Sequence, residues 1–573
     1  MRIPHRAPVL VASLIIAPLA ASMILPRSPF ARAAETTYRT RSQSSGTRFV
    51  RPRSEGPRLS SEDRQKFLRR ILPKLGSEIA FRKVAGSLGI REWRGKRLDL
   101  PSRKTKSQRL ALDQPVDSFD LSQNEPSIAV NPLDYSIVVV FAHNEANFSG
   151  YDNACSIYVS FDAGVSFSYQ DDAPLLNATD VCADPVVRYA PDGSAVYYSY
   201  LSIRDDSSTS DVVVSVGDGA DPASIVTGPT NVIPGLADFM DKPWLGVHTF
   251  DSADGSNDSP GYVYVTGTLF LANGTPDPSD DTCALLINRS PDYGFSWDFS
   301  LTGGEVFGGG PSDCNVNFLH GSRVEGGPGQ QVLACYFNSG ADGYSADLAP
   351  PELLNRFHVT CVSSGDRWNT TSAPFNAATN VAYELNYYLG PGEAYHRWFG
   401  GMFPAIAIDH RGTAHVAFTM DPTASKVDTE GGNVQTTRNA ASAANPPYTT
   451  PWTARITVGS GGRAQGYPTI VAQRSNLTTK SYIYIAYYDH YRSTSAAPNL
   501  IYDVRYKKSL NGGATWPTNA VLVTDVPSMS DYGFIGDYFD SAANMRRVYF
   551  VWTDRADKTS ILDLEDDIYA DRF

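Results

Sequence analysis

Short apolar strands separated by turn residues dominate the chain after residue 110. One unit recurs along this region: a proline, an apolar strand, a turn, and a second strand rich in aromatic and β-branched residues. Pro126 opens such a unit in PSIAVNPLDYSIVVVFAH, and Pro185 opens another in PVVRYAPDGSAVYYSYL. Runs of this kind, bounded by Pro, Gly, Asn and Asp, are typical of antiparallel strands. No helical periodicity of comparable strength follows, so we predict an all-β fold.

The unit occurs seven times, with openings near residues 126, 185, 243, 315, 404, 468 and 537. Successive openings lie roughly 60 to 90 residues apart, which leaves room for four short strands and their loops. Repeated antiparallel units of this size predict a β-propeller of seven blades, or of six if one long blade has been counted twice. The chain ends on a strand-like segment, and residues 114–122 are its expected partner in closing the ring.

A shorter motif repeats within this pattern. It has the form Ser-x-Asp-x-Gly-x-Ser-aromatic at residues 160–167 and 290–297, and residues 509–516 repeat it with Asn for Asp and Thr for the second Ser. Each copy follows a strand-like run and is predicted to form a hairpin turn. The Asp or Asn accepts backbone N–H bonds there, and the Gly supplies a positive φ. The residues expected to have this structural role are Asp162, Asp292 and Asn511.

These features carry a family resemblance. The turn motif resembles the Asp box of the sialidase (BNR-repeat) propellers, and DKPWLGV, GDYFD and VWTDRAD resemble segments of secreted sialidase-like propeller domains. The resemblance covers about residues 115–573. It implies a glycan ligand at the mouth of the central channel, but families sharing the fold include hydrolases, lyases and binding modules. A glycoside hydrolase, a non-catalytic binding or scaffold propeller, and a polysaccharide lyase therefore stay open, and so does whether the protein is an enzyme.

The amino-terminal part differs in charge from the rest. Residues 1–110 hold 25 Lys and Arg against 7 Asp and Glu, whereas the remainder holds 24 against 54. Residues 1–33 are predicted to be a signal peptide, since Arg2 and Arg6 precede an apolar run and Ala31-Arg32-Ala33 offers a cleavage site. Residues 34–110 form a basic extension or pro-segment, helical over residues 61–75 or disordered, and residues 111–573 form the propeller.

This organisation predicts a secreted protein, extracellular or periplasmic, with no membrane span once the signal is removed. Nucleic acid is not an expected partner of an exported protein, and a carbohydrate or glycoconjugate is the expected ligand. The six cysteines suit an oxidising compartment. Two pairs bracket copies of the turn motif and the third lies in successive strand-like runs. The predicted disulfides are Cys155 with Cys182, Cys283 with Cys314, and Cys335 with Cys361.

Acidic residues occupy corresponding positions at the openings of four units: Glu125, Asp184, Asp241 and Asp537. Because the first strand of each blade lines the channel, they are expected to converge near one end of it. They could hold a cation such as Ca²⁺, supply an acid and a base for sugar chemistry, or anchor loops to the next blade. Tyr538, beside Asp537, resembles the family's Tyr nucleophile. None of these roles requires a cofactor other than Ca²⁺.

The segment GEAYHRWFGGMFP, residues 392–404, directly precedes a predicted channel strand. His396, Arg397 and Trp398 suit stacking on a sugar and holding an acidic group, and His396 could be the general base of a lyase; the alternative is loop packing. Arg492 in YYDHYR is a second candidate. A true sialidase also needs three arginines around the substrate carboxylate. The arginines considered for that role are Arg188, Arg397, Arg492 and Arg555. Because they lack the matching sequence context, authentic sialidase activity is doubtful.

Overall fold

The computed structural model describes residues 114–573 with gaps, all within the second of two compact units, Met1–Arg41 and Ser42–Phe573. The predicted signal peptide, the basic extension and its helix over residues 61–75 lie outside the described residues. The gaps are 117–121, 146–153, 205–208, 236–237, 249–260, 272–280, 299–304, 314–316, 340–354, 384–402, 421–432, 442–445, 450, 460–463, 475–480, 491–500, 526, 530–535 and 555–566.

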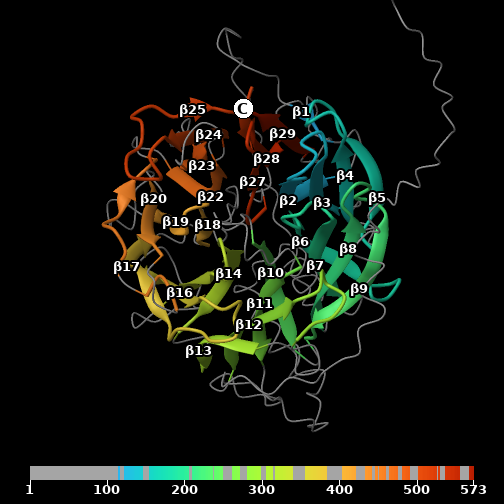
Figure 1. The fold of residues 1–573 in the computed structure, drawn as a ribbon, viewed down its shortest axis with the longest axis horizontal. Coiled ribbons are helices and arrows are strands. Elements are labelled where there is room, and N and C mark those ends of the chain that lie inside the picture. Colours follow the sequence, from blue (N-terminus) through green and yellow to red (C-terminus); the bar gives the residue numbers. More distant parts are fainter. Residues whose placement is uncertain are drawn as a thin grey trace, which may run out of the picture. The chain divides into compact units, whose positions relative to one another are not determined.

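The described residues form seven antiparallel sheets around a common axis, a seven-bladed β-propeller (Figure 1). Blade 1 consists of β2 (Ser122–Val130), β3 (Val138–Glu145), β4 (Ala154–Ser160) and β5 (Ser168–Asp172). Blade 2 consists of β6 (Val181–Tyr189), β7 (Ala195–Ile203), β8 (Ser210–Asp218) and β9 (Ile225–Ile233). Blade 3 consists of β10 (Phe239–Val247), β11 (Val263–Leu271), β12 (Thr282–Ser290) and β13 (Glu305–Asp313). Blades 4 and 5 consist of β14 (Leu319–Gly326), β15 (Val332–Asn338), β16 (Asn355–Ser364) and β17 (Phe375–Tyr383); and β18 (Ala405–Ile408), β19 (Thr413–Met420), β20 (Asn433–Ala440) and β21 (Ile456–Thr457). Blade 6 contains β22 (Ala464–Arg474), β23 (Ser481–His490), β24 (Ile501–Ser509) and β25 (Val521–Leu522), with β26 (Ser528–Met529) also pairing with β24.

Blade 7 joins the two ends of the propeller. It contains β27 (Asp540–Ala543), β28 (Val548–Asp554), β29 (Asp567–Arg572) and, on its outer edge, β1 (Gln114–Pro115). Gln114 pairs with Ala570, and Val116 N donates to Ile568 O at 2.9 Å. The predicted closure is therefore confirmed, and the count is seven blades. No helix occurs among the described residues, so none there is long and apolar enough to cross a membrane.

Adjacent blades pack through aromatic and β-branched side chains. Between blades 1 and 2, the ring of Phe141 lies edge-on to Tyr198 and Tyr200, at centroid distances of 5.1 and 6.0 Å. All three side chains are fully buried. These two tyrosines thus fill the space between two sheets, where an aromatic side chain buries a large apolar area.

A β-bulge interrupts the first strand of blades 1, 2, 3, 4 and 6. In four of them the bulge contains a residue with positive φ that precedes a proline: Glu125 (φ 51°), Asp184 (53°), Lys242 (46°) and Tyr467 (53°). Proline cannot donate to a sheet ladder, so within a sheet it is tolerated at a bulge. In these four blades, the proline that opens the repeat in the sequence therefore marks the bulge that separates the two halves of a channel-lining strand.

The Asp boxes are tight turns between the third and fourth strands of their blades. Asp292 Oδ1 accepts from Ser290 Oγ at 2.9 Å and from Ser296 N at 2.8 Å, and its Oδ2 accepts from Ser296 Oγ at 2.6 Å. In the first box, burial opposes ionisation of Asp162, but the hydrogen bonds from Ser166 and Ser160 lower its pKa to about 2. A fourth box, absent from the sequence prediction, begins at Ser364 and has Asp366 bonded in the same way.

Each Asp box contacts the preceding blade. Ala163 O accepts from Arg572 of blade 7 at 2.7 Å, and Tyr293 OH donates to Asp192 of blade 2 at 2.7 Å. Gly512 O accepts from Arg438 of blade 5 at 3.0 Å. The fourth box follows the same rule, because Arg289 of blade 3 donates to its backbone at Arg367. The boxes therefore hold neighbouring blades together.

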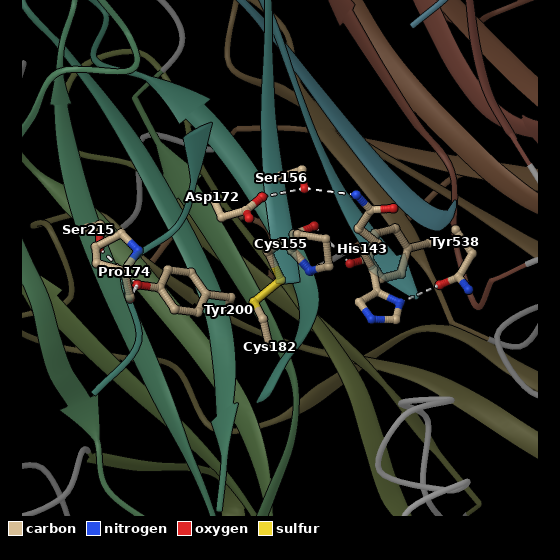
Figure 2. The surroundings of a disulfide bond; sticks show 12 residues. His143, Cys155, Ser156, Asp172, Pro174, Cys182, Tyr200, Ser215 and Tyr538 are labelled. Carbon is tan, nitrogen blue, oxygen red and sulfur yellow. Dashed lines mark hydrogen bonds between the residues drawn. A yellow bond between two sulfur atoms is a disulfide. The ribbon is translucent and has the colours of Figure 1, made fainter. Parts of the chain in front are cut away.

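Two predicted disulfides are present. Cys155 and Cys182 join β4 of blade 1 to β6 of blade 2, near Ser156 and His143 of the first sheet (Figure 2). Cys335 and Cys361 lie directly opposite each other on β15 and β16. The third predicted pair includes Cys314, which is outside the described residues; its expected partner, Cys283, is buried in β12. The two bridges are compatible with the predicted export, which stays a prediction.

Candidate functional site

The channel acids surround a lysine that sequence reasoning had not assigned to the site. Lys242 Nζ lies 2.7 Å from Glu125 Oε1, 2.6 Å from Asp184 Oδ1 and 3.0 Å from Asp537 Oδ2. Lys242 comes from the opening segment of blade 3, and Glu125, Asp184 and Asp537 come from those of blades 1, 2 and 7. All four side chains are at most 5% exposed. The expected convergence is thus found for these three acids. We call these four residues the lysine cluster.

Asp241 does not occupy the corresponding position. Lys242 stands at the bulge where blades 1 and 2 carry their acids, and Asp241 lies one residue earlier. Its Oδ1 accepts from Lys242 N at 3.0 Å, and its Oδ2 lies 3.4 Å from His320 Nε2. Burial lowers the pKa of His320, although Asp241 opposes that shift. The imidazole is therefore neutral near pH 7.

Burial and mutual repulsion control the charges of the lysine cluster. Burial raises the pKa of Asp184 well above its usual range, and Glu125 adds to the shift. Burial also raises the pKa of Glu125, against the attraction of Lys242. For Lys242 itself, burial would lower the pKa, but Asp184, Asp537 and Glu125 together raise it. The ammonium group is therefore held charged and supplies the cation that these carboxylates need.

This arrangement bears on the metal hypothesis. The lysine ammonium fills the space between the three carboxylates where a bound cation would sit. Among the described residues, no three His, Cys, Asp or Glu side chains are arranged to hold a metal ion. A role for Ca²⁺ stays a prediction.

The hydroxyl of Tyr538, the candidate nucleophile, forms a hydrogen bond within the protein. Its hydroxyl donates to Pro185 O at 2.8 Å, and burial raises its pKa well above the ordinary value. The same segment contacts blade 1, because Asp537 N donates to Glu125 Oε1 at 3.2 Å and Gly536 packs on the Glu125 backbone. Residues 536–540 therefore tie blade 7 to blades 1 and 2 across the axis. These contacts correspond to the loop-anchoring alternative.

A separate cavity of about 150 Å³ lies on the axis, lined by the first strands of all seven blades. In blades 1 to 4 the lining residues follow the bulge of the first strand, whereas Glu125, Asp184 and Lys242 of the lysine cluster lie within their bulges. Blades 5 and 6 contribute mainly aliphatic residues, such as Ile406 and Ile470. The charged and aromatic side chains come from the other blades: Arg188, Tyr189, Trp244, Arg323, Glu325, Phe539 and Asp540.

The two arginines of this cavity differ in their partners. Arg188 Nη1 lies 2.7 Å from Asp540 Oδ2, which also accepts from Ser127 Oγ at 2.7 Å. Arg323 instead stacks on Trp244, with its guanidinium carbon 3.2 Å from the ring centre. No carboxylate of the described residues lies within ion-pair distance of Arg323. Burial lowers its pKa to about 9, which still leaves it cationic at neutral pH.

Glu325 adds a neutral acid to the same cavity. Burial raises its pKa to about 8, against the attraction of Arg188, and its Oε2 is buried with no hydrogen-bond partner in the described part of the chain. At pH 7 this carboxyl group is therefore mostly protonated and can donate a hydrogen bond. The cavity thus combines two guanidinium groups, the carboxyl group of Asp540 that pairs with Arg188, and the carboxylic acid of Glu325.

The loop candidates lie outside the described residues: His396, Arg397, Trp398 and Arg492. Of the cavity residues, sequence reasoning considered only Arg188, as an anion contact without family context. Trp244 lies in the segment DKPWLGV, directly after the bulge proline, and that position could have indicated that it lines the channel. Arg323 and Glu325 are two residues apart on one strand, a spacing that places both on one face.

The known proteins that resemble this chain are solved structures of low sequence identity. No protein-family model matches the chain, and no curated protein matches its sequence. Similar solved structures include the polysaccharide lyase Uly1 (9% identity over 76% of this chain and 87% of that chain, TM-score 0.40) and an α-L-arabinofuranosidase of Fusarium graminearum (11%, 81% and 96%, 0.38). A Trypanosoma rangeli sialidase is 12% identical over 83% of this chain and 60% of that chain, with a TM-score of 0.34. With its own sheet topology and Asp boxes, this seven-bladed propeller is consistent with the sialidase-like propeller superfamily.

Proposed function

We propose that this protein binds a glycan that carries an anionic group, such as a carboxylate, in the axial cavity. The observation that carries the proposal is Arg323, a buried cation without a carboxylate partner in the described part of the chain. Leaving a buried charge uncompensated is costly, so a ligand anion would gain the full benefit of neutralising it. The planar guanidinium also matches a carboxylate in geometry.

The rest of the cavity supports a sugar rather than a bare anion. Glu325 and Asp540 offer a hydrogen-bond donor and an acceptor, and Trp244 contributes an apolar ring edge. Mixed hydroxyl and ring contacts of this kind are what a sugar requires. The resemblance to Asp-box propellers points to the same ligand class. The lysine cluster, by contrast, is occupied by its own internal contacts.

A titration of the purified protein with acidic and neutral mono- and oligosaccharides tests the proposal. Acidic sugars should bind and their neutral counterparts should not. Arg323→Met should abolish binding without lowering the melting temperature, because it removes an unpaired buried charge. Arg204→Met is the matched control, since Arg204 pairs with Asp180 and Asp211 and does not line the cavity. Equal binding of neutral sugars, or full binding by Arg323→Met, would refute the proposal.

Hydrolysis of the bound glycan is a second candidate function. Glu325 is mostly protonated at neutral pH, and Asp540 in the same cavity is held by Arg188, so an acid and a carboxylate coexist there. Glycosidases use such a pair as general acid and as nucleophile or base. Mass spectrometry of the panel after incubation decides: a product heavier by one water indicates hydrolysis, an unsaturated sugar indicates a lyase, and an unchanged panel leaves binding alone.

A further inference from the structure

We infer that the protein associates with a second copy of itself through the end of the propeller that carries the Asp boxes, with the acidic blades of one copy on the basic blades of the other. This end consists of the turns between first and second strands and those between third and fourth strands. Both sets lie at one end because successive strands of a sheet run in opposite directions. We call this surface the Asp-box face. The inference goes beyond the proposed function, because it concerns an outer surface and not the axial cavity.

The turns of neighbouring blades contact one another at this face. Asn131 Nδ2, in the first turn of blade 1, donates to Gly219 O in the last turn of blade 2 at 2.9 Å. On the other side, the guanidinium carbon of Arg546 in blade 7 lies 5.8 Å from the ring centre of Tyr135 in the first turn of blade 1. The Asp-box face is therefore continuous across blades 7, 1 and 2.

Charge is divided between two halves of this face. Five Asp and no Lys or Arg occupy the four turns of blades 1 and 2, which are residues 130–137, 160–168, 190–195 and 218–225. Two turns of blades 6 and 7, residues 508–520 and 543–548, hold three Lys and Arg and no acid. None of these charged side chains forms an ion pair within the described part of the chain. Each half can therefore pair with opposite charges on another molecule.

Exposed apolar side chains accompany both kinds of charge. Leu133, which is 75% exposed, precedes Asp134 in blade 1, and Met545, which is 42% exposed, precedes Arg546 in blade 7. Leu510 of blade 6 is 60% exposed. Protein interfaces bury apolar side chains at their centre and surround them with polar and charged groups. These side chains therefore favour a protein partner over an anionic polymer.

The order of the blades makes a second copy the fitting partner. In the ring of seven, blade 4 lies opposite the junction of blades 7 and 1 (Figure 1). A two-fold axis in the plane of the face, through that junction and blade 4, sets blade 1 on blade 7 of the second copy and blade 2 on blade 6. Asp134 then meets Arg546 of the second copy. Leu133 meets Met545, and the acidic turns of blade 2 meet Lys508. Every contact occurs twice, as a two-fold interface requires.

Association also bears on how the axial cavity is studied. Pro132 and Pro191, which line the cavity, belong to the acidic turns, so a second copy covers this end of the cavity. The sugar titrations described above therefore need protein dilute enough to be monomeric. Under that condition, failure of glycan binding and failure of self-association are separate results.

Analytical ultracentrifugation of the purified protein over a range of concentrations tests the association. We expect a dimer that dissociates when the salt is raised from roughly 0.05 M to 0.5 M, because salt screens exposed charges. Arg455→Glu should dimerise like the parent, since Arg455 is exposed beside the outer strand of blade 5 and donates to Thr379 O of blade 4. A protein that is monomeric at roughly 100 μM in the low-salt buffer would overturn the inference.

Charge reversals at two exposed positions test how the copies are arranged. Arg546→Glu and Asp134→Lys should each weaken self-association by roughly tenfold or more, because each sets like charges against one another. An equal mixture of the two variants should form a heterodimer about as tightly as the parent forms its dimer, since both contacts again join opposite charges. Thermal melting shows that each variant is folded. Undiminished dimerisation of either variant, or a mixture of folded variants that stays monomeric, would show that the copies do not meet in this way.

Discussion

Lys242 Nζ lies 2.6 Å from Asp184 Oδ1, and through this contact a lysine of blade 3 is joined to an acid of blade 2 at the axis. Both residues have positive φ and precede a proline, so the same backbone irregularity brings two opposite charges together. Non-glycine residues in this conformation carry a cost of order 1–3 kcal/mol each. This conformation brings the Lys242 ammonium and the Asp184 carboxyl group into contact.

The first prediction concerns the lysine cluster. Lys242→Met should destabilise the protein by about 3–5 kcal/mol, because it leaves buried carboxylates without their cation. Denaturant unfolding measures the change, and Arg474→Met, at an exposed position, should change stability by no more than about 0.5 kcal/mol. Adding Asp184→Asn to Lys242→Met should recover part of the loss. If Lys242→Met is as stable as the parent, the cluster does not hold the blades together.

The second prediction is a pH dependence from Glu325. Its folded pKa of about 8 exceeds the ordinary 4.5, so the folded state binds this proton more tightly than the unfolded state. Stability from this group is therefore full below about pH 4.5 and falls as the pH rises through 8. Glu325→Gln removes the dependence, so the difference in melting temperature between variant and parent should grow in favour of the variant from pH 6 to 9. Parallel curves would contradict the assignment.

The third prediction tests the Asp boxes. Asp292→Ala should cost roughly 1–3 kcal/mol, since it removes the acceptor of the turn and leaves Ser296 N–H without its bond. Asp221→Ala is the control, because Asp221 is an exposed turn residue whose backbone makes the turn contacts. Thermal or urea unfolding compares the two. An Asp292→Ala protein as stable as the control would mean that the box does not hold its turn together.

The fourth prediction concerns the disulfides, which close loops of similar length. The sequence separations are 27 and 26 residues, so loop entropy alone assigns each bridge about 3.5 kcal/mol. Replacing Cys155 and Cys182 together by Ser should cost at least that much, because this bridge joins two blades, whereas the Cys335 and Cys361 bridge lies within one sheet. Unfolding midpoints of the two double variants give the comparison. A smaller loss for the inter-blade pair would refute this ranking.

Much of the fold was predictable because its repeat is visible in the amino-acid sequence. Apolar strands recur with each blade, and the bulge proline and the Asp-box turn each recur in four of the seven blades. Such local patterns can be recognised in the sequence without knowledge of the tertiary structure. The fourth Asp box was not recognised in the sequence because Trp368 occupies the Gly position, with φ 68°, and Thr371 replaces the aromatic residue. Trp368 still packs on the preceding blade, against Phe307.

The site was less predictable for a geometric reason. A bulge inserts one residue into a strand, and a shift of one residue exchanges the two faces. Asp241 was therefore assigned the axial position that Lys242 holds. Arg323 and Glu325 acquire their properties from burial beside residues of other blades, such as Trp244 and Asp540, and no local pattern encodes those distances.

The short strand β1 limits how much of the amino-terminal segment can be removed without opening the ring. Gln114 and Pro115 are the outermost rung of blade 7, and Val116 is fully buried in the core between blades 7 and 1. A protease that trims the basic extension anywhere before Gln114 leaves the ring closed. Truncation beyond Val116 would remove β1 and expose the edge of β29, so any shortened form with a closed ring must retain these three residues.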